Sequence, residues 1–263
     1  MSQSPDQDDL LSQILALRAE IAAHNRRYYE DDAPTISDYD YDQLSLHLRA
    51  LEAMAPDLPP AERFDARVGG SPRADLQSTR HAKPLLSLQD VFAEAEVRDF
   101  TDRLKAQFPE ARFVVERKID GLSVALRYEQ GQFVRGLTRG DGEVGEVVTA
   151  NVRQIAGLPL QLKSALPVLE VRGEVYLPNE AFDRVNARQE IAGGKLFANP
   201  RNCAAGTLRQ LDPAIVAERE LAIFVFNIQV SEGRTFESHA ETLAFLAAEG
   251  FPVSPAYEIC EDR

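Results

Sequence analysis

The sequence predicts an α+β protein with two unequal parts, a small helical domain over about residues 1–70 and a mixed domain over about 71–263. Apolar residues recur with a helical period in the first 55 residues, whereas short strand-like runs bounded by turns dominate after residue 112. Between these regions, residues 55–84 are rich in Pro, Gly and charge, which is typical of a linker. A length of 263 residues with 44% hydrophobic content allows one large domain or two unequal ones.

Two amphipathic helices are expected in the first part, because two apolar stripes keep a spacing of three and four residues. The stripes are Leu10, Ile14, Leu17 and Ile21, and then Tyr41, Leu44, Leu48 and Leu51. Between them, the string DDAPTISD indicates a turn that leads into the second helix. Ser37 is expected to be its N-cap, with Asp40 three residues later in the manner of a capping box.

The mixed domain is expected to begin with a short helix that carries Val97, Phe100 and Leu104 on one side. Strands are then expected at about 113–118, 123–128, 132–138, 168–176 and 219–230, and helices near 144–155, 179–189 and 238–249. No internal repeat of about 20 to 50 residues and no low-complexity block is visible.

The formal net charge is −13 at pH 7, which is unusual for a protein that contacts nucleic-acid phosphates. The acidic excess is uneven, because residues 1–70 hold six Arg, no Lys and fourteen Asp or Glu, a net charge of −8. By contrast, the segment 195–209 holds Lys195, Arg201 and Arg209 and no acid, and it is expected to be a basic surface loop. The composition is therefore compatible with a nucleic-acid partner.

The chain has no apolar run near the roughly 20 residues that span a bilayer, and its first residues, MSQSPDQDD, are acidic. A cytoplasmic protein without a membrane partner is therefore expected. Its two cysteines, Cys203 and Cys260, are too few for a disulfide framework or a tetrahedral thiolate site. Both are expected to be ordinary reduced thiols.

The stretch VVERKIDGLSVALRYEQG, residues 114–131, places charged groups at alternate positions just before a glycine. Because side chains alternate along a strand, Glu116 and Lys118 share a face, and Asp120 follows at a turn that Gly121 permits. Taken alone, such a pattern usually marks an exposed strand with a surface ion pair. Its meaning therefore depends on the motifs that follow it.

Three further strings follow ERKIDG in order: TRGDGEVGE at 138–146, LEVRGEVYLP at 169–178, and FANPRNCAAGTLRQLD at 197–212. Together these motifs closely resemble those of the bacterial NAD-dependent DNA ligases, over nearly the whole chain. The resemblance implies a nucleotidyltransferase (adenylation) domain of mixed, mostly antiparallel sheets with flanking helices. It also implies that this domain is C-terminally incomplete, because members of the family continue beyond the position of residue 263.

The resemblance implies that Lys118 is the nucleophile. A primary amine can attack the adenylyl phosphorus of NAD, form enzyme–AMP and release nicotinamide mononucleotide, for later transfer of AMP to the 5′-phosphate of a DNA nick. The positions that match the AMP site of the family are Ser87, Leu88, Glu116, Arg139 and Glu174. Asp120 and Glu174 are oxygen donors suited to Mg²⁺ (or Mn²⁺) or to ribose hydroxyls, and the choice stays open. Arg201 and Arg209 are candidates for contact with DNA phosphates.

The string RRYYEDDAPTISDYDYDQL helps to decide whether the lysine takes AMP from NAD or from ATP, and hence which leaving group it releases. Asp38, Tyr41 and Asp42 are spaced to share one helical face, where the two like charges favour a cationic partner, and the preceding tyrosines could stack on a cationic ring. A purely structural role is the alternative, because acids suit a first helical turn and tyrosines usually pack. By resemblance, this stretch recognises the nicotinamide mononucleotide half of NAD, which argues for NAD over ATP. The candidate residues are Tyr28, Tyr29, Asp38, Tyr39, Asp40, Tyr41 and Asp42.

Two other functions stay open. One is a non-catalytic module that binds NAD or a partner chain, and the other is an ATP-using RNA ligase or capping enzyme. For the ligase hypothesis the expected partners are NAD and, in the complete enzyme, nicked double-stranded DNA, and the chain is expected to be a monomer. Complete sealing of a nick by this chain alone is not expected.

Overall fold

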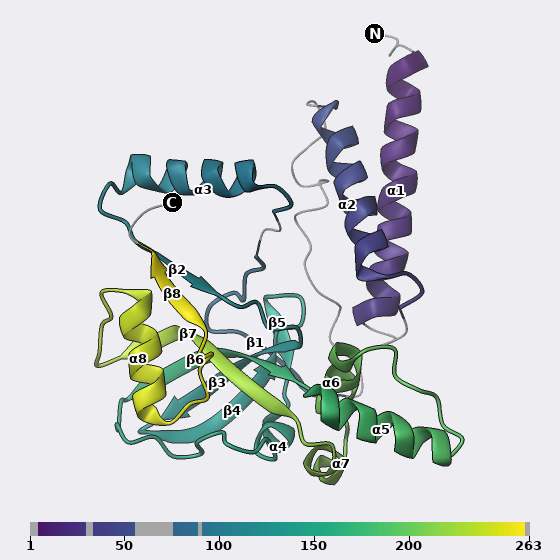
Figure 1. The fold of residues 1–263 in the computed structure, drawn as a ribbon. Helices are drawn as coiled ribbons and strands as arrows, with labels where there is room; N and C mark the ends of the chain where they lie inside the picture. The colour runs from purple at the N-terminus through teal and green to yellow at the C-terminus, as the bar shows by residue number, and fades with distance from the viewer. Residues whose placement is uncertain (1–4, 30–33, 56–75, 89–90, 261–263) are drawn as a thin grey trace.

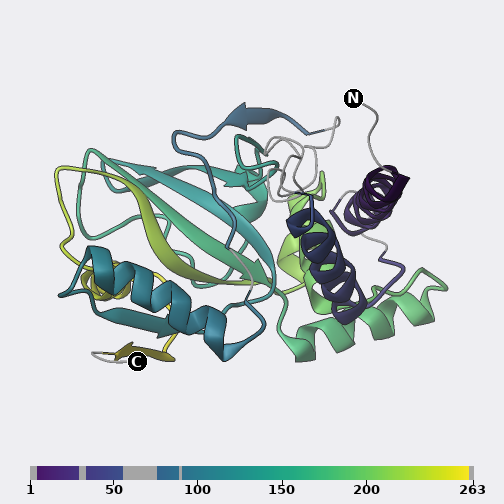
Figure 2. The same cartoon turned by 90° about the horizontal axis from the view of Figure 1, so that it is seen from above.

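The computed structural model describes residues 5–29, 34–55, 76–88 and 91–260. Two long helices stand beside a larger body of sheets and shorter helices (Figure 1). Seen from above, the helical pair lies on the side of the body where α5 (Asn179–Ile191) lies (Figure 2). The predicted α+β class, with a helical part followed by a mixed part, is confirmed.

The helical part is an antiparallel pair formed by α1 (Pro5–Tyr29) and α2 (Asp38–Ala53) (Figure 1). The two predicted apolar stripes face each other: Ile14, Leu17, Ile21 and Leu48 are buried, and the other stripe residues pack against them. Ser37 is the N-cap of α2, since its hydroxyl oxygen accepts a hydrogen bond from the Asp40 amide at 3.1 Å. Both predicted helices and the predicted cap are confirmed.

The body is built on a four-stranded antiparallel sheet with the order β4-β3-β6-β7. Its strands are β3 (Leu122–Glu129), β4 (Gln132–Thr138), β6 (Val168–Tyr176) and β7 (Ala222–Glu232). Two smaller antiparallel pairs flank it, β1 (Ser78–Arg80) with β5 (Val144–Glu146), and β2 (Phe113–Glu116) with β8 (Tyr257–Cys260). The helices besides α5 are α3 (Glu94–Gln107), α4 (Thr149–Val152), α6 (Pro200–Leu208), α7 (Pro213–Glu218) and α8 (His239–Glu249).

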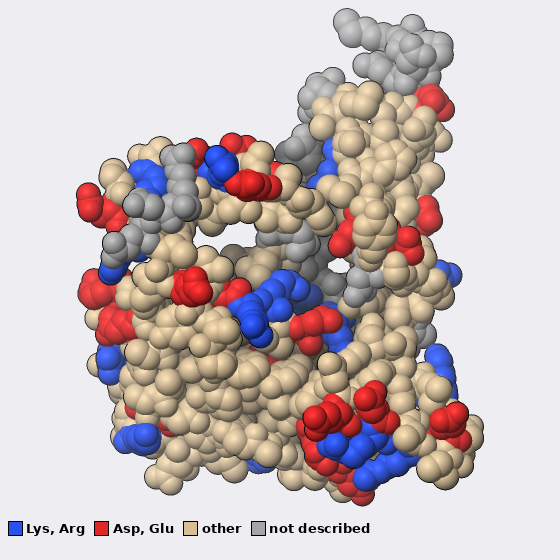
Figure 3. Space-filling view, viewed as in Figure 1, with Lys and Arg blue, Asp and Glu red and all other residues tan. Residues whose placement is uncertain are grey.

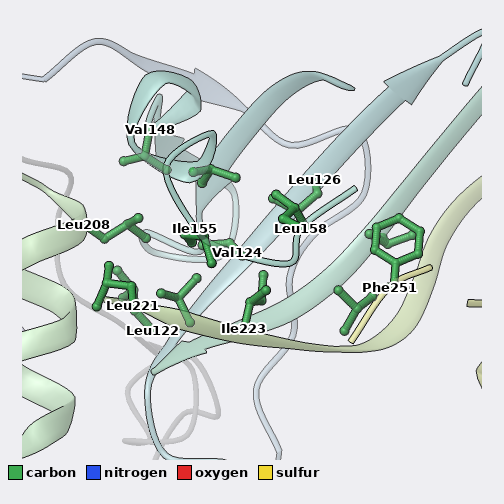
Figure 4. Close-up of a cluster of buried hydrophobic side chains, with 14 of the residues drawn as sticks. Leu122, Val124, Leu126, Val148, Ile155, Leu158, Leu208, Leu221, Ile223 and Phe251 are labelled. Carbon is green, nitrogen blue, oxygen red and sulfur yellow. The ribbon is translucent and has the colours of Figure 1, made fainter. Parts of the chain in front are cut away.

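One face of this sheet packs on the main hydrophobic core (Figure 4). Because side chains alternate along a strand, Leu122, Val124 and Leu126 of β3 point into the core. The intervening Ser123 and the residues opposite it in β6 and β7 therefore lie on the other face, which we call the cavity face. This alternation decides which side chains can line a site.

Three predicted elements differ from the structure. The helix expected near 144–155 is strand β5 followed by the single-turn α4, because the backbone of Val144–Glu146 pairs with β1. The strand expected at 113–118 ends at Glu116, where its pairing with β8 ends. The segment 195–209, expected to be a basic surface loop, contains α6, in which Asn202–Leu208 are all buried.

In the part of the chain that the structure describes, no helix combines the length and the apolar character needed to cross a membrane.

Candidate active site

A cavity of about 350 Å³ lies between the cavity face of the sheet, the segment that joins β2 to β3, and α6. This volume falls within the range of roughly 300–1,000 Å³ that is typical of ligand sites. Basic side chains gather in a hollow near the centre of one face of the molecule (Figure 3). The cavity brings together nine of the predicted site residues: Ser87, Leu88, Glu116, Lys118, Asp120, Arg139, Glu174, Arg201 and Arg209.

Lys118 lies on the short segment between β2 and β3, and its side chain is exposed at the cavity. No hydrogen bond or ion pair joins its ammonium group to another residue of the described part. The segment is held close to β6 at Gly121, where an added Cβ would lie only 2.1 Å from the carbonyl oxygen of Val175. A glycine is therefore required here for the lysine-bearing segment to approach the sheet.

Glu116 is the last residue of β2, and its backbone pairs with Tyr257 of β8. One carboxylate oxygen, Oε2, lies 2.9 Å from Nε2 of His239, the first residue of α8. Glu116 therefore lines the cavity, and its carboxylate contacts His239, a residue that does not line it.

A row of three side chains crosses the cavity face: Ser123 of β3 is in register with Glu174 of β6, which is in register with Phe224 of β7. Burial raises the pKa of Glu174 to about 7, and the positive charges of Arg201, Arg172 and Arg139 oppose this rise. The cavity therefore combines a carboxyl group that titrates near neutral pH with several guanidinium groups.

Arg172 connects the sheet to the segment before α3. Its Nε donates to Ser123 Oγ at 3.0 Å, and an Nη donates to the carbonyl oxygen of Leu86 at 2.8 Å. Burial lowers the pKa of Arg172. These bonds place Ser87 and Leu88 at the cavity, where the resemblance to the ligase family led us to expect them.

The two predicted DNA-contacting arginines lie at the two ends of α6 and both line the cavity. Arg201 Nε lies 3.3 Å from Asp120 Oδ1, and the Arg201 guanidinium lies over the Tyr28 ring at 4.4 Å. Arg209 is buried, with its Nε 3.4 Å from Glu146 Oε2. Contact of either arginine with DNA stays a prediction.

The predicted nicotinamide-binding set is only partly brought to the cavity. Tyr28 reaches the edge of the cavity through its contact with Arg201. None of the described residues of this set, Tyr28 included, lines the cavity. Tyr41 packs within the helical pair, and its hydroxyl donates to Asn25 Oδ1 at 2.8 Å. The other members lie as follows: Tyr39 and Asp40 are exposed, Asp42 is half-buried, and the side chains of Tyr29 and Asp38 are outside the described residues.

A metal site made by the protein alone is not found, because no group of three or more potential ligands occurs among the described residues. Mg²⁺ usually binds through only one or two carboxylates together with substrate phosphates and water. Asp120 and Glu174 both line the cavity, so they fit an ion that a bound phosphate would share. Their role as ligands stays a prediction.

Sequence reasoning did not include several cavity residues in the site, notably Ser123, Arg172, Phe224 and Phe226. Strand alternation could have indicated two of them, because Phe224 and Phe226 alternate with the buried Ile223 and Val225 of β7 and so lie on the opposite face of the sheet. The register between strands, which places them beside Glu174, has no local signature in the sequence.

The chain thus combines a helical pair with a mixed α+β body that holds a ligand-sized cavity lined by a lysine, carboxylates and arginines. The family model of the NAD-dependent DNA ligase adenylation domain matches residues 73–263, and that of the DNA ligase-like, N-terminal NAD⁺-binding domain matches residues 7–69. The chain belongs to the family of NAD-dependent DNA ligases.

Individual relatives agree with this assignment. The DNA ligase of Clostridium kluyveri is 47% identical over 253 residues, which cover 96% of this chain and 38% of the relative. The DNA ligase of Acetivibrio thermocellus is 50% identical over 255 residues, or 97% of this chain and 38% of the relative. That of a Thermoanaerobacter species is 48% identical over 254 residues, with the same coverage of 97% and 38%. The chain thus spans well under half the length of these curated relatives.

Proposed function

We propose that this chain performs the first chemical step of DNA ligation, with NAD as a substrate. Lys118 Nζ attacks the adenylyl phosphorus, a P–N bond forms, and the phosphoanhydride P–O bond breaks so that nicotinamide mononucleotide leaves. The observation that carries the proposal is the position of Lys118, which is exposed at a nucleotide-sized cavity and has no ionic partner among the described residues.

The charge around the cavity supports this chemistry. Arg139, Arg172 and Arg201 line the cavity with Lys118, and fixed positive groups stabilise the charge that develops on a phosphate in the transition state. Phe224 and Phe226 offer an aromatic surface for a base. Mg²⁺ or Mn²⁺, bound with the phosphates near Asp120 or Glu174, would neutralise further charge.

We further propose a division into a nicotinamide-recognising domain, residues 1–70, and an adenylation domain, residues 71–263. The support for it is the separate core of the α1–α2 pair and the contact between Tyr28 and Arg201 at the edge of the cavity. The nicotinamide half of NAD would then lie between the cavity and the tyrosine- and aspartate-bearing stretch 28–42.

In the complete enzyme AMP would pass from Lys118 to the 5′-phosphate of nicked double-stranded DNA, and Arg201 and Arg209 are the proposed phosphate contacts. The related proteins come from bacteria, so we propose that the protein acts on the chromosome in the bacterial cytoplasm, as a monomer.

The test is to incubate the purified chain with NAD and Mg²⁺ and to measure its intact mass. We expect an AMP adduct that is lost in Lys118→Ala and kept in Lys195→Ala, which removes an exposed lysine outside the cavity. An adduct that persists in Lys118→Ala would contradict the proposed nucleophile. An unchanged mass with measurable NAD binding would indicate the non-catalytic module instead.

The same assay addresses the third hypothesis. An RNA ligase or capping enzyme would form the adduct from ATP and would keep its activity in Asp38→Ala and Tyr41→Ala. Adduct formation from NAD and not from ATP would exclude it.

A further inference from the structure

We propose that His239, which lies outside the cavity lining, is a positioning residue for the reaction of Lys118. It acts by holding the carboxylate of Glu116 at the start of the lysine-bearing segment. This inference rests on the proposed function, because it concerns the same site.

The first support is the contact itself. His239 Nε2 and Glu116 Oε2 are 2.9 Å apart, although the two residues are 123 positions apart in the sequence. The exposed fractions of the two side chains are 35% and 24%, so water screens the pair only in part. A hydrogen bond to an ionised carboxylate is shorter and stronger than one between neutral groups.

The second support is the rigidity of the element that carries His239. The N-cap of α8 is Ser238, whose hydroxyl oxygen accepts from the Glu241 amide at 3.1 Å, but this single exposed bond contributes less to the placement of the helix than its buried apolar side chains. One and two turns further, Leu243 and Leu246 are almost fully buried and anchor the helix. The imidazole therefore projects from a fixed helix end, and it can hold Glu116 in one orientation.

The third support is the place of Glu116 in the chain. Regular strand pairing ends at Glu116, and Lys118 follows two residues later on a segment without regular secondary structure. At the far end of this segment, Gly121 packs closely against the backbone of Val175. The contact with His239 thus fixes the near end of the segment, so that both ends of the lysine-bearing segment are anchored.

Loss of the imidazole would free the Glu116 carboxylate to turn toward the ammonium group of Lys118, which lines the same cavity. An ion pair with Glu116 would stabilise the protonated amine, which cannot attack phosphorus. The predicted consequence is slower formation of the adduct at saturating NAD. Loss of a charge-assisted hydrogen bond corresponds to on the order of a tenfold change.

The experiment compares the full-length chain with His239→Ala, His239→Gln and Ser238→Ala. The readouts are the single-turnover rate of adduct formation at saturating NAD, the Kd for AMP and the melting temperature. Gln is the conservative variant, because its side-chain amide can donate to Glu116. Ser238→Ala weakens the same helix end without removing the imidazole.

We expect His239→Ala to slow adduct formation on the order of tenfold and to raise the Kd for AMP severalfold. His239→Gln should restore most of both values, and Ser238→Ala should lower the melting temperature while keeping the rate. In a double-mutant cycle, His239→Ala should add little to Glu116→Gln.

A wild-type rate in His239→Ala would overturn the inference, as would equal slowing in Ser238→Ala or an absence of rescue in His239→Gln. Absence of an adduct in the wild type would instead contradict the proposed function. In that case the Kd for AMP tests the positioning role of His239 independently of the reaction. An unchanged Kd in His239→Ala overturns the inference, and a raised Kd that His239→Gln restores supports it.

Discussion

The guanidinium of Arg201 lies over the ring of Tyr28, 4.4 Å from its centroid, and so joins the helical pair to the cavity. The same side chain reaches Asp120 Oδ1 at 3.3 Å and is only 15% exposed. A cation over an aromatic face contributes about 0.5–2 kcal/mol, more when water is excluded. Arg201 therefore links the ring that we propose to lie near nicotinamide with the segment that carries Lys118.

The first prediction concerns this ring. Tyr28→Leu should raise the Kd for NAD severalfold and leave the Kd for AMP within about twofold, because AMP lacks the half of NAD proposed to lie beside the helical pair. Isothermal titration with both ligands measures the difference. Tyr28→Phe keeps the aromatic face and should behave like the wild type, and an equal loss of affinity for both ligands would contradict the proposed division of the site.

The second prediction concerns Glu174 and pH. Its pKa of about 7 in the folded protein exceeds the ordinary value of 4.5, so its contribution to stability is fully present below pH 4.5 and is lost as pH rises through 7. Glu174→Gln should therefore match the wild type at low pH and be more stable above pH 7, by up to about 3 kcal/mol.

Urea unfolding at several pH values measures this effect. The control is Glu180→Gln, on the exposed first turn of α5, which should change the free energy of unfolding by less than about 0.5 kcal/mol at each pH. A difference between Glu174→Gln and wild type that does not vary with pH would refute the electrostatic explanation.

The third prediction concerns Gly121. In Gly121→Ala the new methyl group would meet the carbonyl oxygen of Val175 at 2.1 Å, so the backbone must move. We expect a loss of about 1–3 kcal/mol of stability and loss of adduct formation, because Lys118 moves with the segment.

The matched control is Gly194→Ala, whose nearest neighbour is the flexible end of the Gln189 side chain at 2.8 Å. It should cost less than about 0.5 kcal/mol and keep the adduct. Chemical denaturation and intact mass provide the two measurements. Normal adduct formation in Gly121→Ala would show that the close approach is dispensable.

The fourth prediction compares two ion pairs. Glu52 Oε1 accepts from both Nε and Nη2 of Arg18, at 2.9 and 2.7 Å, and joins α2 to α1 with only 10% of its side chain exposed. Glu52→Ala should cost about 2–3 kcal/mol in the free energy of unfolding, because it leaves a buried guanidinium unpaired. Glu94→Ala breaks an exposed pair with Arg98 on α3 and should cost less than about 0.5 kcal/mol. Similar costs in both variants would contradict the role of burial.

Much of the fold could be predicted because its signals are local. The two stripes of the helical pair and the cap at Ser37 depend on residues within one or two turns of each other, and both are confirmed. The motifs and the family resemblance that they carry also identified nine residues that the structure brings to one cavity. What each of them does there stays a prediction.

The errors lie where long-range contacts override a local pattern. Val144–Glu146 is a strand because β1 pairs with it, and the basic segment around Arg201 is a buried helix because the core covers it. Neither partner is near in the sequence, so periodicity and charge could not indicate them.

The sequence by itself determined the helical pair, the alternation of the strands and the lysine motif, since each depends only on the spacing of residues that are close together in the chain. Only the tertiary structure decided that His239 meets Glu116 and that Arg201 meets Tyr28. Such contacts arise when packing of the core brings distant elements together, and their geometry depends on the register and the angles of that packing rather than on any local pattern.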